Sequence, residues 1–126
     1  MADQKQFKGT VNFEGKLNLS DGGTVTQGGG AKTTAVTLNA LTGQITMDDA
    51  SLGSGAAVSF DLNNSKIGAQ DVVVVHHGSA GTATAYLCYV SNIAAGSCKI
   101  TVTNQSGGPL GEAIVLHFAV IGGSAS

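Results

Sequence analysis

Residues 113–121 of the chain read AIVLHFAVI. Large apolar residues occupy every second position of this stretch: Ile114, Leu116, Phe118 and Val120. Because successive side chains of a β-strand point to opposite faces, the alternation predicts a strand with one face in a core. The intervening positions are also mostly apolar. This predicts a central strand, or one whose second face is covered by a neighbouring subunit.

Similar short segments precede this stretch at regular intervals, separated by turns rich in Gly, Asn and Ser. They are Thr24–Thr26, Ala35–Leu38, Gln44–Met47, Ala57–Leu62, Val72–His77, Thr84–Ser91 and Lys99–Thr103. No segment shows a sustained helical period of apolar residues. The spacing therefore predicts an all-β fold, a β-sandwich of eight or nine short antiparallel strands and most simply a jelly roll. We expect Phe60, Ile100, Leu116 and Phe118 in its core.

The first part of the chain differs in texture from the rest because charged residues are more frequent there. Between Lys8 and Leu19, the apolar residues Val11, Phe13, Leu17 and Leu19 alternate with polar ones. This pattern predicts a half-buried strand with Gly15 as a bulge or bend. Two interpretations stay open. Residues 1–23 form an N-terminal arm and first strand ahead of a sandwich domain at 24–126, or they form the first hairpin of the sandwich.

Composition excludes several classes of function. The 126 residues are 42% hydrophobic and only 11% charged, with six lysines, no arginine and a net charge of −2. A nucleic-acid partner or an anionic membrane surface is therefore not expected, because phosphate recognition relies heavily on arginine. No apolar run is long enough to span a bilayer. Residues 1–6 lack the apolar core of a signal peptide, so we expect folding in a cytoplasm.

No catalytic arrangement is evident. The chain has no Gly-x-Ser-x-Gly nucleophile turn, and Cys88 lies between Leu87 and Tyr89 in a strand-like segment. We therefore expect no enzymatic activity. Cys88 and Cys98 both fall at apolar positions, which favours reduced, buried thiols over a disulfide. A bridge would require them to face each other across a hairpin, and the sequence leaves this open.

Candidate ligand-binding residues are few. His76 and His77 are adjacent, so a regular strand would point them to opposite faces, and His117 is distant in sequence. Asp48-Asp49 and the Asp61-x-Asn63-x-Ser65 segment carry oxygen ligands suited to calcium, but turn capping is their default role. Residues 28–34, GGGAKTT, fail the phosphate-loop pattern and predict a polar loop. We assign no catalytic, cofactor-binding or metal-binding residue, and we expect no cofactor.

A resemblance extends over residues 24–126. It is carried by residues 24–27 (TVTQ), 34–47 (TAVTLNALTGQITM), 60–65, 69–75, 94–97, 100–104 and 107–121. The segments TLN, GQIT and FAVI are its most specific parts. These residues resemble a group of bacteriophage virion proteins found in cyanophages and other tailed phages, some of them capsid decoration or cement proteins. Residues 1–23 lie outside the resemblance.

The resemblance implies a structural role in a virion. The expected function is to decorate and stabilise a phage capsid by binding the major capsid protein, on the capsid surface and as a homotrimer at three-fold positions. The alternative is a head-fibre or tail-fibre module that recognises host-surface glycans. Sugar-binding platforms usually expose aromatic side chains, and this chain has no tryptophan, two tyrosines and four phenylalanines. The decoration role is therefore favoured.

Overall fold

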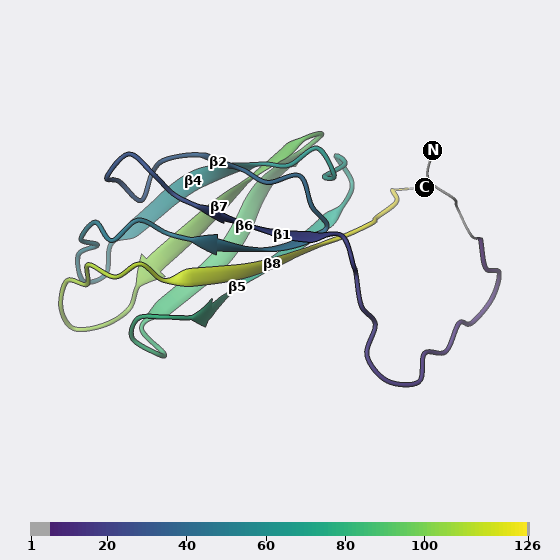
Figure 1. Cartoon of the computed structure of the whole chain (residues 1–126), viewed down its shortest axis with the longest axis horizontal. Helices are drawn as coiled ribbons and strands as arrows, with labels where there is room; N and C mark the ends of the chain where they lie inside the picture. Colours follow the sequence, from purple (N-terminus) through teal and green to yellow (C-terminus); the bar gives the residue numbers. More distant parts are fainter. Residues whose placement is uncertain (1–5, 126) are drawn as a thin grey trace.

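Eight β-strands form two sheets in the computed structural model, which describes residues 6–125 (Figure 1). The strands are β1 (Gly22–Thr26), β2 (Val36–Thr37), β3 (Thr42–Thr46), β4 (Ala57–Asn63), β5 (Val72–Ser79), β6 (Tyr86–Ala94), β7 (Ser97–Asn104) and β8 (Val115–Ile121). Sheet A has the order β1-β3-β8-β5 and sheet B the order β2-β4-β7-β6. The described residues contain no helix, so the predicted all-β class is confirmed. Residues 1–5 of the predicted arm and residue 126 of the predicted sandwich domain lie outside the described range.

The chain crosses to the other sheet after each strand from β1 to β5. A strand and the second strand after it therefore run in the same direction and lie in the same sheet. For this reason β1 pairs with β3, and β2 with β4, in parallel. β7 then inserts antiparallel between β4 and β6, and β8 inserts antiparallel between β3 and β5. The prediction of antiparallel strands was wrong for the two parallel pairs, because side-chain alternation does not encode a neighbour's direction. The predicted jelly-roll connectivity is not confirmed.

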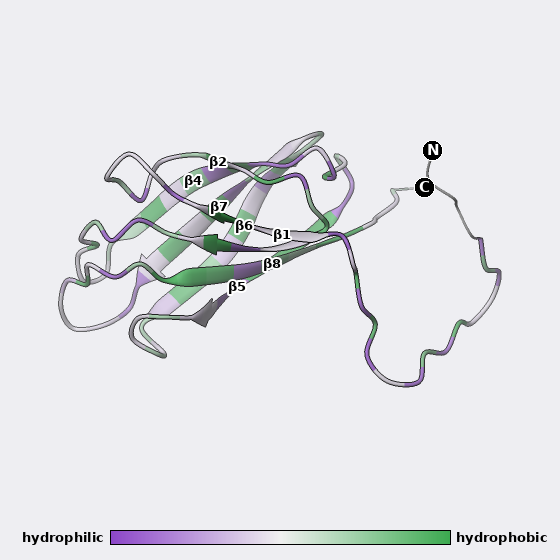
Figure 2. Cartoon of the chain, in the orientation of Figure 1, coloured by the Kyte–Doolittle hydropathy of each residue, from purple (hydrophilic) through white to green (hydrophobic). Residues whose placement is uncertain are grey.

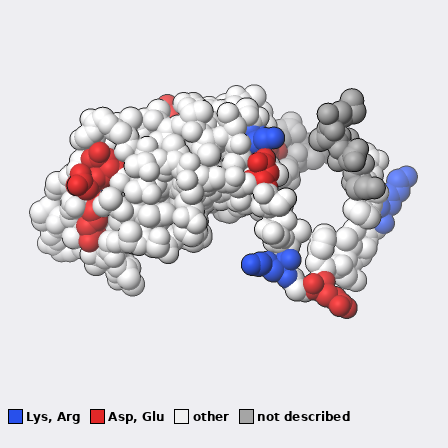
Figure 3. Space-filling model, viewed as in Figure 1, with Lys and Arg blue, Asp and Glu red and all other residues white. Residues whose placement is uncertain are grey.

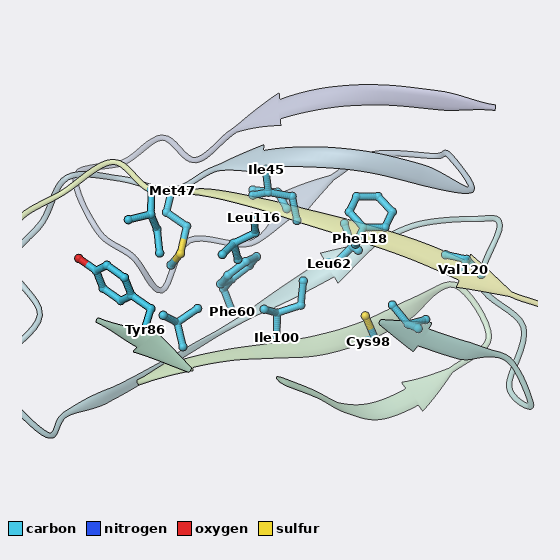
Figure 4. Close-up of a cluster of buried hydrophobic side chains, with 14 of the residues drawn as sticks. Ile45, Met47, Phe60, Leu62, Tyr86, Cys98, Ile100, Leu116, Phe118 and Val120 are labelled. Atoms are coloured by element: carbon cyan, nitrogen blue, oxygen red, sulfur yellow. The ribbon is translucent and has the colours of Figure 1, made fainter. Parts of the chain in front are cut away.

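The core lies between the inner faces of the two sheets, and the strands β3, β4, β7 and β8 all supply fully buried side chains to it (Figure 4). Phe60 and Ile100 are register partners in sheet B and are 2% and 0% exposed. Leu116 and Phe118 on β8 are 0% and 4% exposed. The four predicted core residues are thus confirmed. The prediction that β8 is central is confirmed as well, since it has a partner strand on each side.

Gly43 explains how the Phe118 ring fits against sheet A. The two residues are register partners on β3 and β8. A Cβ built on Gly43 would lie 2.6 Å from the Cε2 atom of Phe118 and 2.7 Å from a methyl of Leu38. The ring therefore occupies the space that any other residue would fill with its own side chain.

The strand predicted between Lys8 and Leu19 does not form. Residues 6–21 carry no strand, and they leave the sandwich as a wide loop (Figure 1). Apolar residues are interspersed with hydrophilic ones along this loop (Figure 2), and Phe13 and Leu17 are 64% and 63% exposed. Alternation is necessary for a half-buried strand, but a strand also needs a neighbour for its backbone hydrogen bonds. No neighbour is present here, and the segment is an arm, which we call the N-terminal arm (residues 6–21).

The base of the N-terminal arm is fixed by backbone hydrogen bonds. The carbonyl of Asp21 accepts from the amides of Leu41 and Thr42, at 2.9 and 3.0 Å. The Asp21 carboxylate also pairs with Lys66 at 3.5 Å. The arm therefore leaves the sandwich at a defined place, beside the start of β3.

Candidate functional site

The strand registers place one set of side chains on the outer face of sheet A, which we call face A. These are Gly22, Thr24 and Thr26 of β1; Thr42, Gln44 and Thr46 of β3; Val115, His117, Ala119 and Ile121 of β8; and Val72, Val74 and His76 of β5. None of them is Asp, Glu, Lys or Arg. Figure 3 views the molecule with sheet A in front, and most of the charged side chains that it shows lie toward the ends of the sandwich and on the arm. Face A is therefore an uncharged surface spanning four strands.

Part of face A over β5 and β8 is apolar. Val72, Val74 and Ile121 are 53%, 49% and 50% exposed, and Ala119 lies between them at partial exposure. Ile121 and Val72 are register partners, as are Ala119 and Val74, so the four side chains form one contiguous patch. Contiguous apolar surface of this kind is typical of a contact with another molecule.

A groove continues this patch toward the N-terminal arm. It has a volume of about 420 Å³ and is lined by Leu17, Leu19, Leu41, Ala119, Val120, Ile121 and Gly122. Leu17 and Leu19 come from the arm, and Leu17 keeps 63% of its surface exposed although it borders the groove. The apolar patch of face A, the groove and the leucines of the arm thus adjoin one another, and the chain itself leaves them largely uncovered.

Two histidines that are far apart in sequence meet on face A. His76 of β5 and His117 of β8 are register partners, and their ring centroids lie 5.3 Å apart with an interplanar angle of 36°. They border a hollow of about 120 Å³ together with Val74, Phe118 and Ala119. His77 points to the other side, where its ring packs edge-on against Tyr86. The prediction that adjacent His76 and His77 diverge is confirmed.

The sequence analysis missed a hydrogen-bonded cluster around Glu112. Its carboxylate accepts from the Tyr86 hydroxyl at 2.7 Å, and from the amide and hydroxyl of Thr82 at 3.0 and 2.9 Å. These donors lower the pKa of Glu112, whereas burial and the carboxylate raise the pKa of Tyr86. The cluster ties the loop after β5 to the segment before β8. Its members are separated by up to 30 residues, so spacing gave no signal for it.

The Gly28–Thr34 loop is held by its own lysine. Lys32 is only 3% exposed, and its ammonium group donates to the carbonyl oxygens of Asp48 and Glu112, the latter at 2.8 Å. Burial lowers the pKa of Lys32, while the nearby carboxylates of Asp48, Asp49 and Glu112 oppose this effect. The ammonium group therefore braces backbone and is not presented to a phosphate.

The predicted acidic candidates have structural partners and are not brought together. Asp48 caps a turn, since its Oδ1 accepts from the amide of Ala50 at 2.8 Å. Asp61 pairs with Lys99 at 3.0 Å on the outer face of sheet B. Residues 6–125 contain no group of three or more His, Cys, Asp or Glu side chains that could hold a metal ion.

Both cysteines are free thiols. Cys88 is register partner to Val102 and Cys98 to Leu62, so they do not face each other across the β6–β7 hairpin. Burial raises the pKa of each thiol to about 11, which keeps both protonated near neutral pH. The preference for unpaired cysteines is thereby confirmed, and Cys98 is buried as predicted, whereas Cys88 is only partly buried.

Comparison of the chain with protein-family models, with curated proteins and with solved structures found no match. Within the described residues there is no helix long and apolar enough to cross a membrane.

Proposed function

We propose that this protein is a structural virion protein that decorates a phage capsid by binding the major capsid protein. The observation that carries the proposal is the uncharged face A, which the apolar groove continues toward the exposed apolar side chains of the N-terminal arm. A molecule that acts by stable packing needs such a surface and no reactive centre. The resemblance of residues 24–126 to phage decoration proteins supplies the identity of the partner.

The energetics of face A suit docking. Fully burying a Val or Ile side chain contributes about 1.5–3 kcal/mol, so completing the burial of a half-exposed one contributes roughly 1 kcal/mol. Val72, Val74 and Ile121 are each about half exposed. No ammonium or carboxylate group of face A has to lose water when a partner approaches. The apolar side chains of the arm, such as Phe7 and Phe13, add area that the sandwich alone does not have.

We further propose that the protein acts as a homotrimer on the virion surface, after assembly in the host cytoplasm. A trimer matches three-fold positions of a capsid because one interface then serves every copy. Val115 and Ala119 lie on face A, so a second layer, from capsid or neighbouring subunit, would complete their burial. Sedimentation of the isolated chain tests the oligomeric state. A monomer at the concentrations used for capsid binding would contradict the proposed trimer.

The alternative role is a fibre module that binds glycans. Phe60, Phe118 and Tyr86 are buried, which leaves Tyr89 as the exposed aromatic residue of the sandwich among residues 22–125. Sugar rings are usually held against aromatic faces with polar partners, and a single half-exposed tyrosine is a weak platform. Counting the copies of the protein per virion distinguishes the two roles. Hundreds of copies would support decoration, and a handful would support a fibre.

A pair of matched variants tests the docking face. Val74 on β5 and Leu87 on β6 are 49% and 50% exposed, and both lie on edge strands, one in each sheet. Val74→Lys places an ammonium group in the apolar patch, so binding to capsids that lack the protein should weaken at least tenfold in a cosedimentation assay. Leu87→Lys should bind within twofold of the wild type. Equal binding by both variants, or equal loss, would contradict docking through face A.

A truncation tests the arm separately. Removing residues before Leu19 leaves the hydrogen bonds of Asp21 intact, so the sandwich should keep its stability. Weakened capsid binding by this variant is the expected result. Full binding would show that the sandwich alone carries the contact.

A further inference from the structure

The most specific chemistry on face A is the pair of imidazoles at His76 and His117. They lie directly opposite each other on adjacent antiparallel strands. Gln44 is the register partner of His117 on its other side, so β5, β8 and β3 present His, His and Gln in one row. Directly opposite side chains have Cβ atoms about 4.5–5.5 Å apart, close enough to share one ligand.

The ring separation fits a shared metal ion. Zinc–nitrogen bonds are about 2.0–2.1 Å, and a ring nitrogen lies about 1.1 Å from the ring centre, so two imidazoles on one tetrahedral ion have centroids about 5.2 Å apart. The observed centroid distance is 5.3 Å. The observed separation of the two rings is therefore the separation that a shared ion requires.

The surroundings hold the pair in place. A Cβ built on Gly78 would lie 2.1 Å from Cδ2 and 2.4 Å from Nε2 of His117, so the ring occupies the space beside this glycine, against β5. The side chains of Val74 and Ala119, on the same face of the sheet, border the same hollow. Apolar walls lower the local dielectric and strengthen a metal–ligand interaction.

We propose that His76 and His117, with Gln44 as a third ligand, form a binding site for a divalent transition-metal ion such as Zn²⁺, Ni²⁺ or Cu²⁺. Neutral imidazoles prefer these ions over Mg²⁺ and Ca²⁺, which take oxygen ligands. Face A offers no carboxylate to attract the harder cations and no lysine to repel an ion. Water or a donor from another molecule completes the coordination. This inference does not depend on the proposed capsid role.

His77 supplies a matched control on the same strand. Its Nε2 lies 3.0 and 2.6 Å from the carbonyl oxygens of Ser79 and Ala80, on the side of the sheet away from the pair. Removing it deletes one histidine but leaves the His76–His117 pair unchanged. The three variants to compare are His76→Asn, His117→Asn and His77→Asn.

The experiment uses the full chain without a polyhistidine tag, titrated with ZnCl₂ and NiCl₂ by calorimetry, with MgCl₂ as reference. The expected result is one Zn²⁺ or Ni²⁺ per chain, no binding of Mg²⁺, and affinity reduced at least tenfold in His76→Asn and in His117→Asn. His77→Asn should bind within twofold of the wild type, and metal-free melting curves check that each variant is folded. The proposal is overturned if the wild type binds neither ion, or if either variant of the pair binds as tightly as His77→Asn.

Discussion

Replacement of Lys32 by methionine tests how a buried ammonium group contributes to stability. The wild-type side chain is 3% exposed and donates to two backbone carbonyl groups, those of Asp48 and Glu112. Hydrogen bonds from a charged donor contribute about 1.5–3 kcal/mol each, so Lys32→Met loses roughly 3–6 kcal/mol from the two. The variant also avoids the cost of burying an ammonium group and gains apolar contacts. We therefore expect a net loss of about 2–4 kcal/mol.

The matched control is Lys66→Met. Lys66 pairs with Asp21 at 3.5 Å, and the two side chains are 48% and 43% exposed. An exposed pair of this kind contributes about 0–1 kcal/mol. Urea unfolding followed by circular dichroism gives both free energies, and Lys32→Met should also melt roughly 6–15 °C lower than the wild type. If Lys32→Met loses no more stability than Lys66→Met, the bracing role of the buried ammonium group is wrong.

Three further predictions concern the core, the Glu112 cluster and the thiols. Phe118→Ala should reduce the free energy of unfolding by about 3–5 kcal/mol in urea, since the ring is buried, and a loss below about 1 kcal/mol would place it outside the core. The folded pKa of Glu112 is lowered from its ordinary value of 4.5, so its stabilising effect is complete above that pH and disappears as the pH falls below it. Acid titration of Glu112→Gln should show a flatter loss of stability in this range than the wild type, and identical profiles would contradict the cluster. Cys88 and Cys98, with pKa values of about 11, should react slowly with a thiol reagent at neutral pH until the protein is unfolded, and reductant should leave the melting curve unchanged.

Short apolar segments, most of them with a period of two, and the turns between them were sufficient to locate the strands. Each of the eight predicted segments from Thr24 onward overlaps an observed strand, and the core positions Phe60 and Phe118 follow from the same period. The period is local because it arises from the pleat of a single strand. The same signal misled between Lys8 and Leu19, where a strand-like pattern has no neighbouring strand to pair with.

The candidate sites depended on contacts between residues distant in the chain. His76 and His117 meet only because β8 inserts beside β5, and Thr82 and Glu112 meet only because the loop after β5 reaches the segment before β8. Neither contact has a characteristic sequence spacing. The parallel β1–β3 pairing was missed for the same reason, since direction and neighbour are properties of the whole chain path.

The all-β class, the strand positions, the inward residues and the absence of charge along β5 and β8 can be predicted from the amino-acid sequence, because each is a property of consecutive residues. The folded structure is needed to show that Lys32 is buried and braces backbone, that residues 6–21 form no strand, and that an uncharged face with a histidine pair spans sheet A. These features arise when strands from different parts of the chain are placed side by side. Which strands become neighbours depends on the free energy of the whole molecule, so it cannot be predicted from any single segment of the sequence.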